Sequence, residues 1–177
     1  MFPELERKKE RRRCDYAYHL EYRTRWSDND MYAHLNNSVY AFLFDSIINT
    51  YLVQHCGLNP FSSPSLPTEI SHEQSNTEFQ PSSQIGLVVS SYCDFFASVS
   101  FPDVLDLSLR VTKLGKSSVT YEVGVFRKGE EAVKVVGGFT HVFVNKLTMR
   151  PISTRTHPAI RKGLEKLVMK DERGAKL

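Results

Sequence analysis

The chain has 177 residues, of which 41% are hydrophobic and 24% charged, so it predicts one globular domain with a sizeable apolar core. The net charge is only +3, and much of the basic excess lies in the run from Arg7 to Arg13. No apolar run approaches the ~18 residues of a membrane span, and the N-terminus lacks the apolar core of a secretory signal. The composition therefore argues against a membrane-spanning protein.

Residues 1–14 are expected to form a basic, flexible arm that precedes the domain. No aromatic residues interleave with its basic run, so we expect a solvated arm without a nucleic-acid partner, although nucleic-acid binding is the alternative. Cys14, Cys56 and Cys93 are odd in number and widely spaced, and no histidine shows ligand spacing with them. This pattern predicts a reducing compartment with no structural disulfide and no metal site.

Alternating polar and apolar side chains predict a first strand over residues 15–26. Residues 38–53 are apolar around almost their whole circumference and leave only a narrow polar stripe, which includes Asp45. An α-helix with this pattern is covered by other structure on nearly every side, and Gly57 predicts where it ends. We expect Asp45 to have a structural role on the polar stripe.

Four prolines and many serines predict that residues 59–84 are mainly loop, with one short strand near Glu69–His72. Four strands are then predicted in quick succession, with hairpin turns between the last three: 85–96, 104–114, 119–126 and 132–145. The Gly137-Gly138 pair predicts a bulge or a close backbone approach. Pro158 predicts the first residue of a final helix that runs to about Met169.

This order of elements predicts an α+β fold, in which one curved antiparallel sheet wraps around one long central helix. A single domain is expected over residues 15–172, with an additional C-terminal helix and a short tail at 173–177. Such a sheet has two edge strands, and pairing of edges between subunits is a common way to cover them. We therefore expect self-association as a dimer or tetramer.

The stretch RWSDNDMYAHLNNSVY places two aspartates, a histidine and an Asn-Asn pair directly before the apolar helix. It resembles the motif of the hotdog-fold thioesterases, specifically the 4-hydroxybenzoyl-CoA thioesterase-like group, and is also similar to a segment of plant acyl-ACP thioesterases. The later stretch FPDVLDLSLRVTKLGKSSVTYEVGVF resembles the central hairpin of the same family. The resemblance covers residues 18–144 and implies a hotdog fold. It also implies hydrolysis of an acyl-CoA thioester to free acid and CoA, with no cofactor beyond the coenzyme A of the substrate.

The resemblance assigns Asp30 as the catalytic aspartate, which would either activate water or attack the thioester directly through an anhydride. Free N–H groups at the helix start, around Asn37, would stabilise negative charge on the thioester oxygen, while Asn36 or Asn37 caps the helix. His34 would either assist the substrate or, as we favour, be partly buried and hold the loop. The alternative for Asp30 is a turn or capping residue, and Asp28 is expected to be structural.

For substrate binding, the resemblance points to Lys116, Ser117 and Ser118 near the phosphates of CoA and to Tyr40 within the motif. The alternative for the Lys116 turn is a solvated hairpin. Plant acyl-ACP enzymes have a catalytic asparagine where this chain has Tyr32, which favours acyl-CoA over acyl-ACP. Four aromatic side chains are compatible with an apolar wall for an acyl or aryl group: Phe42, Phe44, Phe95 and Phe96.

Two further functions stay open. One is a non-catalytic acyl-CoA-binding module on the same fold, and the other is an acyl-ACP thioesterase. A hotdog dehydratase or hydratase ranks well below both, because the required Asp/His motif is absent. The chain ends in Ala175-Lys176-Leu177, a conservative variant of the peroxisomal Ser-Lys-Leu address. If the import receptor reads this tail, the protein is peroxisomal, and otherwise we expect it in the cytoplasm. Imaging an N-terminally tagged protein with and without the last three residues tests this expectation.

Overall fold

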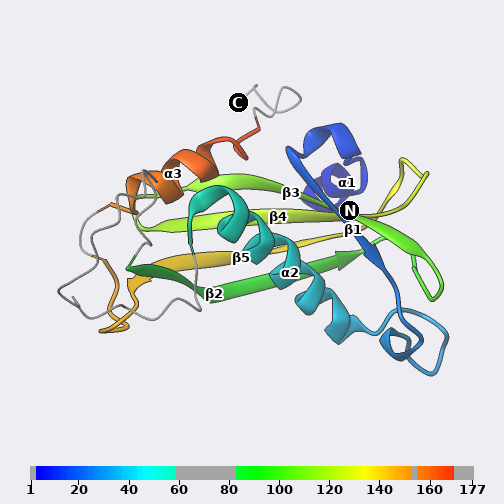
Figure 1. Cartoon of the computed structure of the whole chain (residues 1–177). Coiled ribbons are helices and arrows are strands. Elements are labelled where there is room, and N and C mark those ends of the chain that lie inside the picture. Colours follow the sequence, from blue (N-terminus) through cyan, green and yellow to red (C-terminus); the bar gives the residue numbers. More distant parts are fainter. Residues whose placement is uncertain (1–2, 59–82, 153–154, 170–177) are drawn as a thin grey trace, which may run out of the picture.

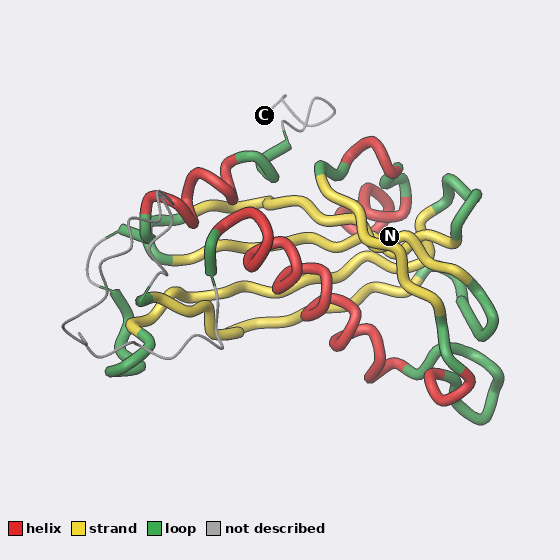
Figure 2. The backbone as a smooth tube through the Cα atoms, in the orientation of Figure 1, coloured by secondary structure: helices red, strands yellow, loops and turns green. Residues whose placement is uncertain are grey.

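The computed structural model describes residues 3–58, 83–152 and 155–169 (Figures 1 and 2). Most of the predicted loop at 59–84, the short strand near Glu69–His72 and the tail with the peroxisomal address lie outside the described residues. Within the described part of the chain, no helix has both the length and the hydropathy to cross a membrane.

Five strands form one antiparallel sheet in the order β1-β3-β4-β5-β2. The strands are β1 (Tyr18–Arg23), β2 (Gln84–Phe95), β3 (Val104–Leu114), β4 (Ser118–Arg127) and β5 (Val133–Asn145). The α-helices are α1 (Pro3–Lys9), α2 (Asn37–Cys56) and α3 (Pro158–Glu165). The predicted α+β arrangement of an antiparallel sheet, a long helix and a C-terminal helix is confirmed.

Two elements are shorter than the sequence predicted. The first strand covers 18–23 instead of 15–26, because single turns of 3₁₀-helix, Arg13–Asp15 and Trp26–Asp28, flank it on both sides. The last helix ends at Glu165 instead of near Met169. The chain leaves the helix there because Val168 bridges to Val111 of β3.

Helix α2 lies across one face of the sheet, which we call the inner face (Figure 1). Its start is capped by Asn36, whose side chain accepts a hydrogen bond from the Ser38 N–H, and its end is closed by Gly57 at φ 63°. The side chains that it buries recur at helical spacing and form the main core with the strands: Tyr40, Leu43, Phe44, Ile47, Ile48, Tyr51, Leu52 and Cys56.

The predicted close backbone approach occurs where α2 crosses β5. A Cβ atom added to Gly137 would lie 2.5 Å from the ring of Phe44 and 2.6 Å from the carbonyl oxygen of Tyr92. Only a residue without a side chain leaves room for the Phe44 ring at this point. Gly137 therefore sets how closely the helix lies on the sheet.

A single chain covers only one side of α2, although its composition predicted cover on nearly every side. The opposite side is exposed and includes Phe42, which is 71% exposed, together with Val53 and Ser46. Asp45 also lies there and accepts a hydrogen bond from the Asn49 side chain, which agrees with the structural role expected of it. The apolar residues on this side lack cover because the sheet of one chain curves around a single face of the helix.

The N-terminal segment differs from the flexible arm that the sequence predicted. Residues 3–9 form α1, which packs on the opposite, outer face of the sheet (Figure 1). Lys8 pairs with Asp94, Arg11 with Glu122, and Tyr16 is buried against Phe126. The basic run is ordered because the outer face offers buried carboxylates to it, and β3 is consequently covered on both faces.

Candidate active site

A buried carboxylate supports the loop that connects β1 to α2. Asp28 is only 2% exposed and accepts hydrogen bonds from the Arg25 N–H, the Arg25 Nε and the Tyr22 hydroxyl. Burial alone would disfavour the charged carboxylate, but the hydrogen bonds from Arg25 and Tyr22 outweigh it and lower the pKa of Asp28. The Asp28 carbonyl also accepts the Asn36 N–H at 2.8 Å, which ties the loop to the helix start. This geometry agrees with the structural role expected of Asp28.

Asp30 lies two residues further on, in a tight hairpin. Its Oδ1 accepts the N–H groups of Tyr32 and His34 at 2.8 and 3.1 Å, and its backbone N–H donates to the His34 carbonyl at 2.7 Å. Ala33 adopts a left-handed conformation with φ 58° to complete the turn. Asp30 therefore does help to form the turn, as the alternative predicted, but it does so through only one of its two carboxylate oxygens. The other, Oδ2, has no hydrogen-bond partner among the described residues.

The helix that follows presents an open donor. Asn36 is the cap, and its side chain occupies the N–H of Ser38, while its carbonyl accepts the N–H of Val39. Among the described residues, nothing accepts a hydrogen bond from the N–H of Asn37, the first residue of α2. An N–H at this position also carries the partial positive charge of the helix start. The carboxylate of Asp30 and this donor therefore belong to one short segment.

Tyr40 lies one turn into the helix and is 3% exposed. Burial, followed by the nearby Cys93 and the charge of Asp30, raises the pKa of Tyr40 above its ordinary value. The Tyr40 hydroxyl is therefore neutral, and it lies close enough to Asp30 for the charge of that carboxylate to act on it. Its ring packs edge-on against Phe95, with 5.3 Å between the centroids.

His34 differs from the partly buried histidine that we favoured. Its side chain is exposed, and its backbone, not its imidazole, makes the hydrogen bonds to Asp30. The reason is the tight turn, which satisfies Asp30 with main-chain groups and leaves the imidazole in solvent. The imidazole is thus available to an incoming molecule.

The structure does not bring the Lys116 turn near Asp30 within one chain. The Lys116 carbonyl accepts the N–H and hydroxyl of Thr156, and the Gly115 carbonyl accepts a hydrogen bond from Arg161 of α3. Helix α3 in turn contacts the C-terminal half of α2, where the Tyr51 hydroxyl donates to the Gly163 carbonyl. The 20 residues of α2 span about 30 Å, so the two sequence motifs lie at opposite ends of the helix.

The four phenylalanines proposed as an apolar wall do not lie together. Phe44 belongs to the main core, whereas Phe42 of α2 and Phe95 of β2 are exposed. Phe96 packs against a separate small cluster formed by Tyr16, Phe126, Val133 and Val136. Three large side chains flank Asp30, and their exposure was not predicted from the sequence: Trp26, Met31 and Tyr32 are 79%, 87% and 73% exposed. Large apolar residues inside a polar loop are the signal that could have identified them.

The described residues contain no group of three His, Cys, Asp or Glu side chains arranged to hold a metal ion. The groups that the structure places at the candidate site are a carboxylate, a helix N–H, a neutral tyrosine and exposed apolar side chains. These groups can polarise a carbonyl and activate a nucleophile beside it.

Comparison with known proteins identifies the family. The model of the thioesterase superfamily matches residues 32–134, a segment that starts two residues after Asp30. No curated protein sequence matches the chain. Among solved structures, the PA5185 protein from Pseudomonas aeruginosa strain PAO1 is 38% identical, with 89% of this chain and 95% of that chain covered and a TM-score of 0.73.

Two more distant structures show the same fold. A thioesterase from Thermus thermophilus, solved with coenzyme A and zinc, is 20% identical, with 86% of this chain and 95% of that chain covered and a TM-score of 0.60. Slr0204, a 1,4-dihydroxy-2-naphthoyl-CoA thioesterase from Synechocystis, is 11% identical, with coverages of 85% and 96% and a TM-score of 0.63. The family match spans more than half of the chain, and the sheet and helix are arranged as the hotdog fold requires. The chain therefore belongs to the thioesterase superfamily.

Proposed function

We propose that the protein hydrolyses an acyl-CoA thioester to the free acid and CoA, with Asp30 and the N–H of Asn37 as its reacting groups. The observation that carries this proposal is the half-buried Asp30 carboxylate, with Oδ2 open, in the hairpin directly before the open first N–H of α2. In a member of the thioesterase superfamily, this pairing supplies both functions that thioester cleavage needs.

In the general-base form, Asp30 Oδ2 takes a proton from water as the water oxygen attacks the thioester carbon. The carbonyl oxygen becomes an anion and accepts the Asn37 N–H, which is oriented before the reaction begins. Collapse of this intermediate breaks the C–S bond, and the thiolate of CoA recovers the proton from Asp30. In the nucleophilic form, Oδ2 bonds to the carbon directly, CoA leaves as a thiolate, and water then cleaves the resulting anhydride.

Two observations favour CoA over an acyl-carrier protein. The Thermus thermophilus relative was solved with coenzyme A, and Slr0204 acts on a CoA thioester. This chain also carries Tyr32, which is exposed, where the plant acyl-ACP enzymes that it resembles have a catalytic asparagine.

The proposal predicts release of free thiol from acyl-CoA. A screen with short, long and aromatic acyl-CoAs, read by a thiol-reactive dye, should show turnover on at least one class. Binding of these compounds without any thiol release would support the non-catalytic acyl-CoA-binding module instead. Parallel assays with the same acyl groups on an acyl-carrier protein decide between the two carriers.

We further propose that the working form is at least a dimer joined along β2. The two edges of the sheet differ, because β1 exposes the charged side chains of Glu21 and Arg23, whereas β2 carries no charge from Gln84 to Cys93. Charged residues on an edge discourage strand pairing, and uncharged exposed residues such as Val88 permit it. A neighbour along β2 would also lie beside the uncovered apolar side of α2.

Such a neighbour would supply the Lys116 turn to the Asp30 end of the first subunit. The two lie at opposite ends of α2 within one chain, so a shared site requires two chains. The Lys116 side chain is exposed, and only its backbone carbonyl holds the turn, so it can contact the phosphates of a bound CoA.

Mixing two inactive variants tests this arrangement. When Asp30→Asn and Lys116→Glu subunits exchange at equal amounts, about half of the dimers are mixed, and each mixed dimer holds one intact site. Activity should recover to roughly a quarter of the wild-type value. Native mass spectrometry must first establish subunit exchange. Once exchange is established, the absence of recovery would contradict a site shared between chains.

A further inference from the structure

The loop between β2 and β3, residues 96–103, lies beside the segment that leads from β1 to α2 (Figure 1). Near the start of that segment, the Thr24 hydroxyl donates to the Ser100 carbonyl at 3.1 Å. Near its end, the Leu35 N–H donates to the Val99 carbonyl at 2.8 Å. The β2–β3 loop therefore holds the segment on both sides of its hairpin.

A third contact comes from the side chain of Asn29, which directly precedes Asp30. Its Oδ1 accepts a hydrogen bond from the N–H of Phe101 at 3.0 Å. The backbone of Asn29 also forms an antiparallel bridge with Leu35, which closes the base of the hairpin. Asn29 thus joins the base of the hairpin to the β2–β3 loop, one residue away from the Asp30 carboxylate.

The β2–β3 loop is itself fixed to the sheet. The Ser100 N–H donates to Oδ2 of Asp103 at 2.9 Å, and the Asp103 N–H donates back to the Ser100 carbonyl at the same distance. The Nε of Arg127, on β4, lies 3.0 Å from the same Asp103 oxygen. Val99 is 1% exposed and belongs to the main core. A hairpin attached to this loop is therefore fixed relative to the sheet.

The hairpin depends on such contacts because its tip, residues 31–34, is exposed, so packing in the core contributes little to its position. The bond between Asp28 and Asn36 ties it to the helix, and the bond from Asn29 ties it to the sheet. The N–H of Asn37 is placed by the packing of α2 on the same sheet. A misplacement of ~1 Å between reacting groups can cost roughly 100-fold in rate, so these ties bear on catalysis.

We propose that Asn29 is a positioning residue for thioester hydrolysis: by accepting the Phe101 N–H, it fixes the Asp30 carboxylate relative to the Asn37 N–H. This inference rests on the proposed function, because it concerns the placement of the two groups that react. Asn29 acts through Asp30 and needs no contact with the substrate. Its loss should therefore lower kcat and leave KM nearly unchanged.

Asn29→Leu removes the acceptor and keeps a side chain of similar size. On the best acyl-CoA, kcat should fall roughly 10-fold or more, while KM stays within about twofold of the wild-type value. Asn29→Asp keeps an oxygen for the Phe101 N–H and should recover most of the lost kcat, with each variant measured at its own pH optimum. A role in stability alone would instead lower the midpoint of thermal unfolding and leave kcat per folded molecule unchanged.

Amide hydrogen exchange, read by NMR, follows the hairpin without any substrate. In Asn29→Leu, the N–H groups of Tyr32, His34 and Leu35 should exchange several-fold faster than in the wild-type protein, because the base of the hairpin opens more often. The amides in the middle of β4 should keep their wild-type rates, since they report on opening of the sheet as a whole.

Gln54→Leu is the matched control, because it also replaces an amide acceptor by leucine. Oε1 of Gln54 accepts the Tyr18 hydroxyl at 3.2 Å near the opposite end of α2, so kcat and exchange in the hairpin should stay within about twofold of the wild-type values.

An unchanged kcat in Asn29→Leu, alongside an inactive Asp30→Asn, would overturn the positioning role and leave the proposed function intact. Unchanged exchange in the hairpin would also overturn it. A wild-type protein that releases no thiol would contradict the proposed function itself, and the exchange rates would then decide separately whether Asn29 holds the hairpin.

Discussion

Replacing Asp30 by asparagine should lower turnover on the best acyl-CoA by at least about 100-fold, within the range typical of acid–base groups. The asparagine side chain would keep an Oδ1 acceptor for the N–H groups of Tyr32 and His34, so the hairpin should hold its shape. It would lose the anionic Oδ2, which is the atom that takes a proton from water or attacks the thioester. The loss should therefore appear in kcat, measured by thiol release at saturating substrate.

Asp45→Asn is the control for this experiment. Asp45 lies on the exposed side of α2, and its carboxylate accepts a hydrogen bond from Asn49, so the same chemical change there should leave turnover close to the wild-type rate. Thermal unfolding of both variants should match that of the wild-type protein within a few degrees. Near wild-type turnover in Asp30→Asn would show that another group performs the chemistry.

Acidification should destabilise the protein strongly through one buried histidine. His141 on β5 is 2% exposed, packs against Tyr121 and Phe139, and neither ring nitrogen has a hydrogen-bond partner among the described residues. Burial lowers the pKa of His141 to about 4, from an ordinary value of about 6.5. At pH values between about 4 and 6.5, the His141 imidazole is therefore protonated in the unfolded chain but neutral in the folded protein. The free energy of unfolding should thus fall by about 3 kcal/mol as the pH drops from 6.5 to 4.

His141→Leu should remove most of this dependence, because leucine has no proton to gain in the unfolded chain. At pH 7.5 the variant should be about as stable as the wild-type protein, since it exchanges unsatisfied buried nitrogens for apolar atoms. Urea unfolding at several pH values measures both effects. The control is His55→Gln, at an exposed position in the last turn of α2, which should retain most of the acid sensitivity. An unchanged pH dependence in His141→Leu would assign the effect to other groups.

The strands and the long helix could be predicted because the spacing of their polar and apolar side chains follows the period of each element. Val104–Leu114 alternates with a period of two residues, and the strand has the predicted bounds. The last helix was predicted too long because Val168 resembles a helical residue in sequence, yet it bridges to Val111, which is distant along the chain. The N-terminal segment was missed for the same reason, since its order depends on carboxylates of β2, β3 and β4.

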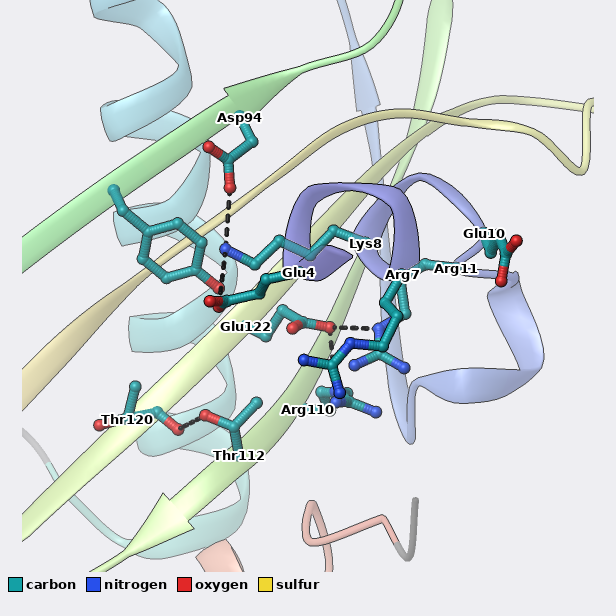
Figure 3. Close-up of a pocket in the computed structure, with 11 residues that line it drawn as sticks. Glu4, Arg7, Lys8, Glu10, Arg11, Asp94, Arg110, Thr112, Thr120 and Glu122 are labelled. Carbon is teal, nitrogen blue, oxygen red and sulfur yellow. Dashed lines mark hydrogen bonds and ion pairs between the residues drawn. The ribbon is translucent and has the colours of Figure 1, made fainter. Parts of the chain in front are cut away.

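In the candidate site, too, the residues that depend on local sequence could be predicted, and the features that depend on distant contacts could not. Asp30, Asn37 and the cap at Asn36 belong to one short segment, so the resemblance and the rules of helix termini identify them without further information. The exposure of His34 and the distance of Lys116 from Asp30 depend on how the hairpin closes and on where α3 packs. No local pattern encodes those two facts. A pocket of about 570 Å³ on the outer face forms only where α1 meets the sheet (Figure 3), so it is lined by residues as far apart in sequence as Arg7 and Arg110.

The uncharged edge of β2 also bears on the solubility of the protein. A separated subunit would present Val88, Val89 and the unpaired backbone of this strand to every other unfolded or partly folded chain nearby. Exposed, uncharged edges are the usual starting points of aggregation, and the charges of Glu21 and Arg23 protect only β1. If subunits pair along β2 as proposed, substitutions that keep them apart should therefore cause precipitation before they cause unfolding.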